Sequence, residues 1–121
     1  MHTKATISII DDDSEVRGSL TSLLRSAGYR VRTFDSAETF LAHNANDSAC
    51  LLTDLHMPGM DGLELQAQLH RLGCSIPVIV MTAFPTKEAQ ARALDGGAVA
   101  FLTKPLDPEL LLDKLRPLTE R

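Results

Sequence analysis

The sequence has few cysteines and histidines, and neither type is spaced like a set of metal ligands. Cys50 and Cys74 form no C-x-x-C pair, and the four histidines show no H-x-x-x-H spacing, so we do not expect a zinc site. Two cysteines far apart in a chain are typical of a reduced protein. We expect both thiols to be small buried apolar groups.

Long hydrophobic runs are also missing. No apolar stretch approaches the length of a membrane span, and the N-terminus has no signal-peptide core, so we expect a soluble, cytoplasmic protein without membrane contact. Basic residues are scarce relative to acidic ones, 12 against 16, which gives a formal net charge of -4. We therefore expect no direct binding of nucleic acid by this chain.

The chain does have enough apolar material for one core, since 44% of its 121 residues are hydrophobic. We expect a single domain over residues 1–121. Five short apolar runs alternate with five amphipathic stretches through short connections, which predicts an α/β fold with a doubly wound, five-stranded parallel sheet. The expected strands are 6–10, 29–34, 49–54, 78–81 and 98–102, and the expected helices are 15–27, a short segment after 36, 63–72, 87–95 and 108–118.

Polar residues before the amphipathic stretches can cap the helix N-termini. The stretch 87–95 differs from the others because its apolar residues are mostly alanines, which bury little area, so we expect this helix to be held weakly and to move. The expected N-caps are Ser14, Ser36, Thr86 and Asp107, with Asp13 and Asp61 as further cap or turn residues. The other expected inward-facing residues are Val16, Leu20, Leu23, Leu24, Ala27, Phe40, Leu41, Leu65, Leu69, Leu72, Leu111, Leu112, Leu115 and Leu118.

Asp54 ends the central apolar run and is soon followed by Pro58-Gly59. In open parallel sheets, chemistry collects where strands end at their carboxyl side, so Asp54 is a candidate nucleophile. An acid at the end of a strand is also a common cap for a turn or for the next helix. The position alone leaves both interpretations open.

Other polar residues follow the ends of predicted strands, namely Asp11, Asp12, Thr82 and Lys104. A parallel sheet brings them to the same edge as Asp54. Three carboxylates at about 4 Å would repel by on the order of 4 kcal/mol per pair at an effective dielectric near 20, so cations must offset them. Lys104 supplies one charge, and Mg²⁺ with its oxygen ligands fits the rest. This set predicts a phosphoryl-binding site.

Four motifs at these strand ends resemble those of the receiver domain of bacterial two-component response regulators, and the resemblance covers residues 7–115. Each motif is modest alone, but four in this order are specific. The family fold is flavodoxin-like, as in CheY, with strand order 2-1-3-4-5. The motifs are Ile9-Ile10-Asp11-Asp12, the segment TDLHMPGMDG from Thr53 to Gly62, Met81-Thr82-Ala83 and Phe101-Leu102-Thr103-Lys104-Pro105.

The resemblance implies a phosphorylation-dependent switch in which Asp54 accepts a phosphoryl group from a sensor histidine kinase. Apart from phosphorylating and dephosphorylating itself, such a domain is not an enzyme. The resemblance further implies that Asp12, Asp54 and the backbone carbonyl of His56 ligate Mg²⁺, with Asp11 bound through water. All four positions match the family motifs in this sequence.

The remaining motif residues would couple the site to an output. By the resemblance, Lys104 pairs with the phosphoryl group, with a cis bond to Pro105, and Thr82 closes onto it. Phe101 matches an aromatic position that turns inward when this threonine moves. The output would be the surface of the fourth helix, fifth strand and fifth helix, available for a homodimer or an effector.

Further stretches are similar to the FixJ-like branch, whose members carry a C-terminal helix-turn-helix domain and regulate transcription. No such domain follows in this sequence, so we expect either a fragment of a longer protein or a protein that works alone. The stretches are Ser14 to Leu20, Gly28 to Val31 and Phe34 to Leu41.

Two other functions remain open besides the phosphorylation-dependent switch. One is a Mg²⁺-dependent phosphohydrolase with an aspartyl-phosphate intermediate, although such enzymes usually need a second acid at the position of His56 and an inserted cap. The other is an interaction module that is never phosphorylated. His56 and Phe84, each two residues after a site residue, are expected to tune the reaction. Our hypothesis is that Phe84 hinders the attacking water.

Overall fold

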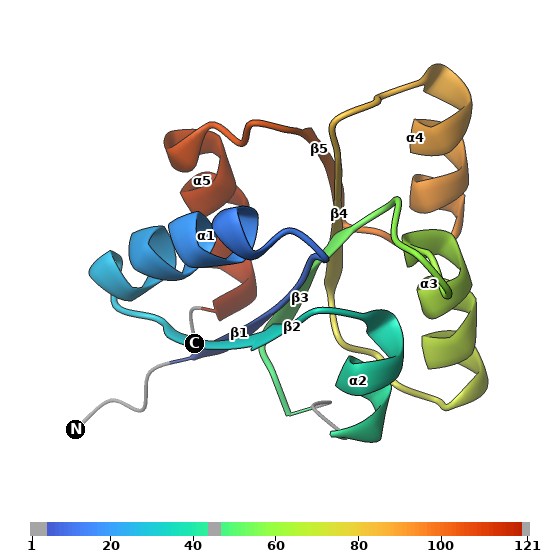
Figure 1. The fold of residues 1–121 in the computed structure, drawn as a ribbon, viewed down its shortest axis with the longest axis horizontal. Coiled ribbons are helices and arrows are strands. Elements are labelled where there is room, and N and C mark those ends of the chain that lie inside the picture. The colour runs from blue at the N-terminus through green and yellow to red at the C-terminus, as the bar shows by residue number, and fades with distance from the viewer. Residues whose placement is uncertain (1–4, 44–46, 120–121) are drawn as a thin grey trace.

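The computed structural model describes residues 5–43 and 47–119, so both ends of the predicted domain lie outside the described residues. Strands and helices alternate along the chain, as the sequence predicts (Figure 1). The elements are β1 (Thr6–Ile10), α1 (Ser14–Ser26), β2 (Arg30–Phe34), α2 (Ala37–Ala42), β3 (Cys50–Asp54), α3 (Gly62–Arg71), β4 (Val78–Thr82), α4 (Lys87–Asp95), β5 (Ala100–Thr103) and α5 (Pro108–Thr119).

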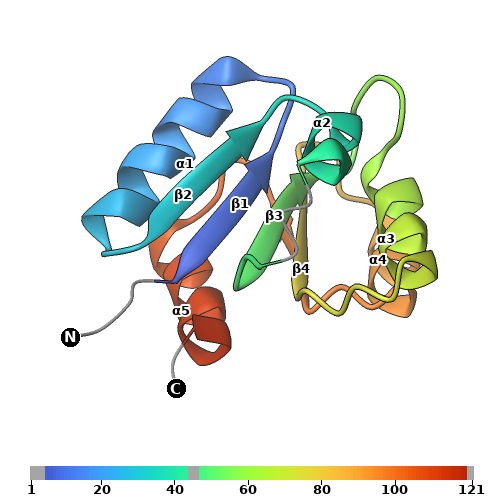
Figure 2. The same cartoon turned by 90° about the horizontal axis from the view of Figure 1, so that it is seen from below.

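The five strands form one parallel sheet in the order β2-β1-β3-β4-β5, which confirms the predicted fold class and strand order (Figure 2). The register pairs Asp54 with Met81 and Thr82 with Thr103, so the last residues of β3, β4 and β5 lie near one edge of the sheet. Every residue of β3 and β4 is buried, whereas the edge strand β2 carries exposed arginines. The continuous apolar runs are therefore the central strands, as expected for strands covered on both faces.

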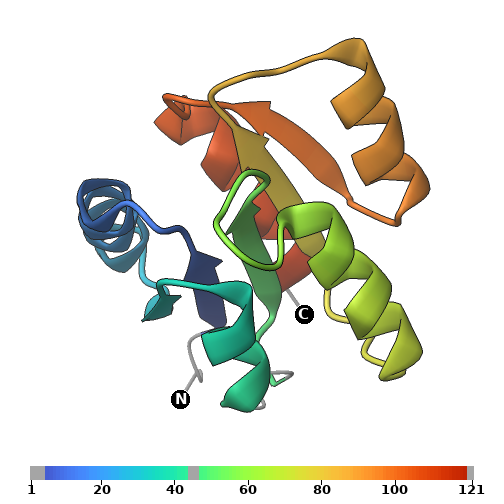
Figure 3. The ribbon, with the colours of Figure 1, turned by 45° about the vertical axis from the view of Figure 1, so that its right-hand side comes forward.

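Helices cover both faces of the sheet (Figures 1 and 3). On one face, Leu24 of α1 and Leu111 of α5 belong to one apolar cluster with the side chains of β1 and β3. On the other face, Phe40 of α2, Leu65 of α3 and Ala93 of α4 belong to a second cluster. The sheet thus separates two cores. Among the described residues no helix is long and apolar enough to cross a membrane.

The helix boundaries differ from the predicted ones at α1. Asp13, not Ser14, is the N-cap, because its carboxylate accepts hydrogen bonds from the backbone N–H groups of Glu15 and Val16, and Ser14 is the first helical residue. Tyr29 closes the other end, since its N–H donates to the carbonyl of Leu24, so β2 begins one residue later than expected. The predicted caps Ser36 and Thr86 are confirmed, and Asp61 caps α3 in a capping box.

Four other expectations about burial or boundaries are corrected. Leu72 is 61% exposed because it lies at the C-cap of α3, and Ala27 at the C-cap of α1 is also exposed. Ala98 precedes β5 because its N–H donates to Ala93 at the end of α4. Both cysteines are free thiols, but only Cys50 is buried; burial raises its pKa to about 12, while Cys74 is half-buried. Helix ends and turns, where apolar periodicity stops, account for three of these four differences.

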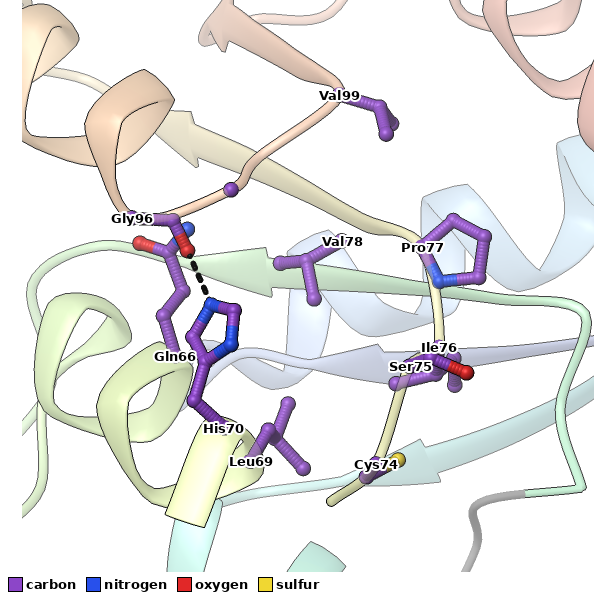
Figure 4. A pocket seen from close by; sticks show the side chains of 11 residues that line it. Gln66, Leu69, His70, Cys74, Ser75, Ile76, Pro77, Val78, Gly96 and Val99 are labelled. Carbon is purple, nitrogen blue, oxygen red and sulfur yellow. Dashed lines mark hydrogen bonds between the residues drawn. The ribbon is translucent and has the colours of Figure 1, made fainter. Parts of the chain in front are cut away.

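Helix α4 is attached mainly at its C-terminal end. Ala93 is its one buried residue. Two side chains of α3 bond to the backbone there, Gln66 Nε2 to the carbonyl of Ala93 at 3.0 Å and His70 Nε2 to the carbonyl of Gly96 at 2.9 Å. They lie beside a cavity of about 290 Å³, lined also by Pro77 and other residues at the opposite edge of the sheet from the strand ends (Figure 4). The alanine-rich helix thus combines a small apolar contact with two hydrogen bonds from α3 at its C-terminal end.

Candidate functional site

The carboxyl edge of the sheet carries three acids, Asp11, Asp12 and Asp54, which we call the acidic cluster. Each offers an oxygen, and these oxygens lie within 4.8 Å of one another. Asp11 is fully buried, Asp54 is buried at the end of β3, and Asp12 is exposed. The structure therefore brings together the three acids that the sequence analysis predicted at one edge.

Lys104, one residue past β5, reaches the acidic cluster from the other side. Its Nζ lies 2.6 Å from Asp11 Oδ2 and 3.3 Å from Asp54 Oδ2. The peptide bond from Lys104 to Pro105 is cis, as the resemblance implied. Because one ammonium group bridges two buried carboxylates, the predicted lysine is placed where it can offset their mutual repulsion.

Asp54 and Lys104 each shift the pKa of the other. Burial raises the pKa of Asp54 and the negative charge of Asp11 adds to this, while the charge and hydrogen bond of Lys104 lower it in part. Burial alone would lower the pKa of Lys104, but the hydrogen bond to Asp11 and the two carboxylate charges outweigh burial, so its pKa is raised. Asp54 is thus a carboxylate whose charge is costly to maintain, next to a lysine that stays protonated.

Asp11 is held by four hydrogen bonds within the chain. Its Oδ2 accepts from Lys104, and its Oδ1 accepts from the backbone N–H of Asp13 at 2.9 Å. Its own N–H donates to the carbonyl of Phe34 at 3.1 Å, and its carbonyl accepts from Arg17 Nη1 at 2.6 Å. Asp11 is therefore fixed in position by both its side chain and its backbone.

Arg17 is the contact that sequence reasoning missed. It lies on α1, and an arginine on a helix is most often a solvated charge, so composition gave no reason to select it. The one available signal was its position on the first turns of the helix that follows the two acids. In the structure it is half-buried against the Asp11 carbonyl.

Thr82 and Phe101 lie on the neighbouring strands β4 and β5, Thr82 at the end of its strand and Phe101 two positions earlier in the register. Thr82 is fully buried at the end of β4, its carbonyl accepts from the Lys104 N–H at 2.8 Å, and its hydroxyl accepts from the Phe84 N–H at 3.0 Å. Phe101 is half-buried on β5 and packs against the core beneath α2, α3 and α4. The backbone thus joins the predicted threonine directly to the predicted lysine.

Two exposed aromatic rings, of His56 and Phe84, lie on the loops that follow β3 and β4. Phe84 is 73% exposed, and its ring centroid lies 6.3 Å from that of His56 in an edge-to-face arrangement. The two positions that were expected to tune the reaction are therefore close to one another, across the loops that follow β3 and β4.

The loop after β3 is held closely against the end of that strand. The Leu55 N–H donates to the carbonyl of Met81, and the Gly62 N–H donates to the carbonyl of Leu55. A Cβ on Gly62 would lie 2.9 Å from the carbonyl oxygen of Asp54, which leaves room for glycine only. The backbone around Asp54 is thereby fixed on both sides.

The acidic cluster suits a hard cation. It offers carboxylate oxygens and no sulfur or imidazole, the donor set that Mg²⁺ prefers, and Mg²⁺ is bound through a few carboxylates plus waters. No hydrogen bond to the side chain of Asp12 is found within residues 5–43 and 47–119, whereas both side-chain oxygens of Asp11 are used. Asp12 and Asp54 are therefore the acids best placed to hold the ion directly.

A groove of about 400 Å³ opens beside Lys104, between α1 and the connection from β5 to α5. Apolar side chains cover most of it, with acidic groups near the end of α1 that faces the cluster. The groove is lined by Asp13, Glu15, Val16, Ser19, Leu20, Leu23, Lys104, Pro105, Leu106 and Pro108.

Comparison with known proteins agrees with this geometry. Residues 7–116 match the response regulator receiver domain family. The chain is 42% identical over 120 residues to nodulation protein W of Bradyrhizobium diazoefficiens, covering 98% of this chain and 53% of that protein. It is 39% identical over 112 residues to the transcriptional regulatory protein FixJ of the same organism, covering 92% of this chain and 55% of that protein. The chain spans about half the length of the curated relatives it matches.

A solved structure shows the same fold. The crystal structure of FixJ-N superposes with a TM-score of 0.86 at 36% identity, covering 97% of this chain and 94% of that one. The match favours a signalling domain over the phosphohydrolase considered from the sequence, and receiver domains are switches, not classical enzymes. From the strand order, the acidic cluster and these matches together, the chain belongs to the family of receiver domains of two-component response regulators.

Proposed function

We propose that Asp54 accepts a phosphoryl group from the phosphohistidine of a sensor histidine kinase and that the charged product switches the domain. The observation that carries this proposal is the ammonium of Lys104 between two buried carboxylates, one of them at the exact end of a central strand. A lone cap or turn residue would need no such partner. A partner that docks at this edge would meet the groove that opens beside Lys104.

The reaction uses groups that the edge of the sheet already holds. A carboxylate oxygen of Asp54 attacks phosphorus, an acyl phosphate bond forms, the phosphorus–nitrogen bond breaks, and the imidazole leaves with the electron pair. Mg²⁺ held by Asp12, Asp54 and the backbone carbonyl of His56, with Asp11 reached through water, would neutralise charge on the phosphoryl oxygens. Lys104 stays in place during the step because its shorter contact is to Asp11.

The same groups then respond to the new charge. Phosphorylation adds acceptor oxygens next to Lys104 and close to the buried hydroxyl of Thr82. Turning that hydroxyl toward the phosphoryl group breaks its bond from the Phe84 N–H and disturbs the loop that leads to α4. Since α4 buries only Ala93, and Phe101 is only half-buried, this part of the domain is the least costly to rearrange.

The surface of α4, β5 and α5 is therefore the proposed output, used for a homodimer or an effector. Control of transcription is the proposed process, because the similar FixJ protein is named a transcriptional regulatory protein. The family implies a histidine kinase as phosphodonor, and the cognate kinase would be of that class.

Incubation with acetyl phosphate and Mg²⁺, followed by intact-protein mass spectrometry, tests the proposal. We expect one phosphoryl group per chain, lost on treatment with hydroxylamine, and none on Asp54→Asn. Asp113→Asn, an exposed aspartate on α5, is the matched control and should be labelled like the parent. Labelling of Asp54→Asn at the parental rate would contradict the proposal, and continuous release of phosphate would favour the phosphohydrolase.

A further inference from the structure

Arg17 bonds to the backbone of the acidic cluster instead of to a carboxylate. Its Nη1 donates to the carbonyl of Asp11 at 2.6 Å, and it forms no salt bridge with an acid in the described part of the chain. The planar guanidinium group of arginine matches the geometry of a carboxylate and is the usual choice for such ion pairs. Here it contacts the peptide unit that joins Asp11 to Asp12.

We propose that Arg17 is a positioning residue that orients Asp12 toward the cation by holding the peptide between Asp11 and Asp12. This inference rests on the proposed function, because it concerns the same Mg²⁺ site.

The two neighbouring acids differ in how their side chains are held. Asp11 is fully buried and is bound at its side chain by Lys104 and Asp13. Asp12 is exposed, and within the described ranges nothing bonds to its side chain. Its direction therefore depends on the backbone that carries it, and the carbonyl held by Arg17 belongs to that backbone.

Helix α1 fixes the position from which Arg17 donates to the Asp11 carbonyl. Arg17 closes the first turn of α1, since its N–H donates to the carbonyl of the N-cap Asp13. Leu20 and Leu24 of the same helix are buried against the sheet. The guanidinium is half-buried and planar, so its donor is pre-oriented. Removal of a group that hydrogen-bonds to a metal ligand and orients it typically weakens metal binding by 10- to 100-fold.

The charge of Arg17 and its positioning role predict opposite effects of its removal on the affinity for Mg²⁺. A positive charge near a cation site weakens cation binding, so if only charge mattered, loss of Arg17 would strengthen binding of Mg²⁺. If Arg17 positions Asp12, loss of Arg17 weakens binding. The sign of the change therefore separates the two roles.

The test is a titration of the ¹⁵N-labelled protein with Mg²⁺, without any phosphodonor, followed by the amide signals of Asp12 and Asp13. We expect Arg17→Met to bind Mg²⁺ about tenfold more weakly than the parent. Arg25→Met removes the same charge from the exposed last turn of α1 and should bind as the parent does. Arg17→Gln is a second variant, with a polar end, and the same loss is expected.

Unchanged or tighter binding of Mg²⁺ by a folded Arg17 variant would overturn the inference while leaving the proposed function intact. A parent protein that binds no Mg²⁺ would overturn both. The dispersion of the amide spectrum before titration shows whether each variant is folded, so a loss of binding through unfolding is recognised.

Discussion

Replacing Asp54 with asparagine should stabilise the folded protein at neutral pH. The attraction between Asp54 and Lys104 at 3.3 Å contributes about 5 kcal/mol at an effective dielectric near 20. Repulsion from Asp11 and Asp12, whose oxygens lie within 4.8 Å, costs about 3.5 kcal/mol or more for each pair. Exposure of Asp12 weakens its share, but burial of Asp54 adds a desolvation cost, so the carboxylate is unfavourable by on the order of 2 kcal/mol.

Urea unfolding at pH 7 without Mg²⁺, followed by circular dichroism, measures this difference. A gain of about 2 kcal/mol corresponds to an increase in Tm of roughly 8 °C for a domain of this size. Asp113→Asn is the control, because Asp113 and its partner Arg116 are exposed, and its effect should stay within about 0.5 kcal/mol.

The pH dependence supplies a second check. The pKa of Asp54 is raised above its ordinary value of 3.8 in the folded state, so the folded state binds this proton more tightly than the unfolded state does. The stability of the parent therefore falls as pH rises from below 3.8 through the folded pKa. The advantage of Asp54→Asn should be full above that folded pKa and should disappear toward pH 3.8. A variant that is less stable than the parent at pH 7, or an advantage that grows on acidification, would refute the reasoning.

Three further substitutions test other parts of the site. Lys104→Met leaves two buried carboxylates without their cation and should lower the free energy of unfolding at pH 7 by about 3 kcal/mol, measured with urea; an unchanged value would contradict the bridging role. Gly62→Ala places a Cβ 2.9 Å from the Asp54 carbonyl oxygen and should lower the free energy of unfolding by about 1–3 kcal/mol. Gly18→Ala is the control, because nothing lies within 4 Å of its Cβ, and it should raise the free energy of unfolding by about 0.5–1 kcal/mol. Equal effects of the two substitutions would contradict crowding at Gly62. Phe84→Ala should speed loss of the phosphoryl group by admitting water, and unchanged or slower decay would count against a shielding ring.

The fold was largely predictable because its signals are local. Continuous apolar runs identified the buried strands β3 and β4, and polar residues before the helices identified most N-caps. The choice between Asp13 and Ser14 failed because both can cap, and only the backbone angles decide. The strand order came from the resemblance alone, since parallel strands of similar composition do not encode their neighbours.

The site was predictable as a set of residue types but not as a set of contacts. Strand ends brought Asp11, Asp12 and Asp54 to one edge, as expected. The full burial of Asp11 and its bond from Arg17 depend on how α1 docks against the sheet, which no local pattern shows.

The two bonds that Gln66 and His70 make to the end of α4 also determine how that helix can tilt. Because these bonds join the C-terminal end of α4 to α3, a tilt of the helix in the proposed switch would pivot near residues 93–96 and displace the first turn most. Nine residues span about 13 Å, so a tilt of about 10° moves that turn by about 2 Å and the pivot hardly at all. In the proposed switch, a small rearrangement next to Thr82 would therefore be amplified at the surface nearest the strand ends, while the amino-terminal edge of the sheet would stay in place.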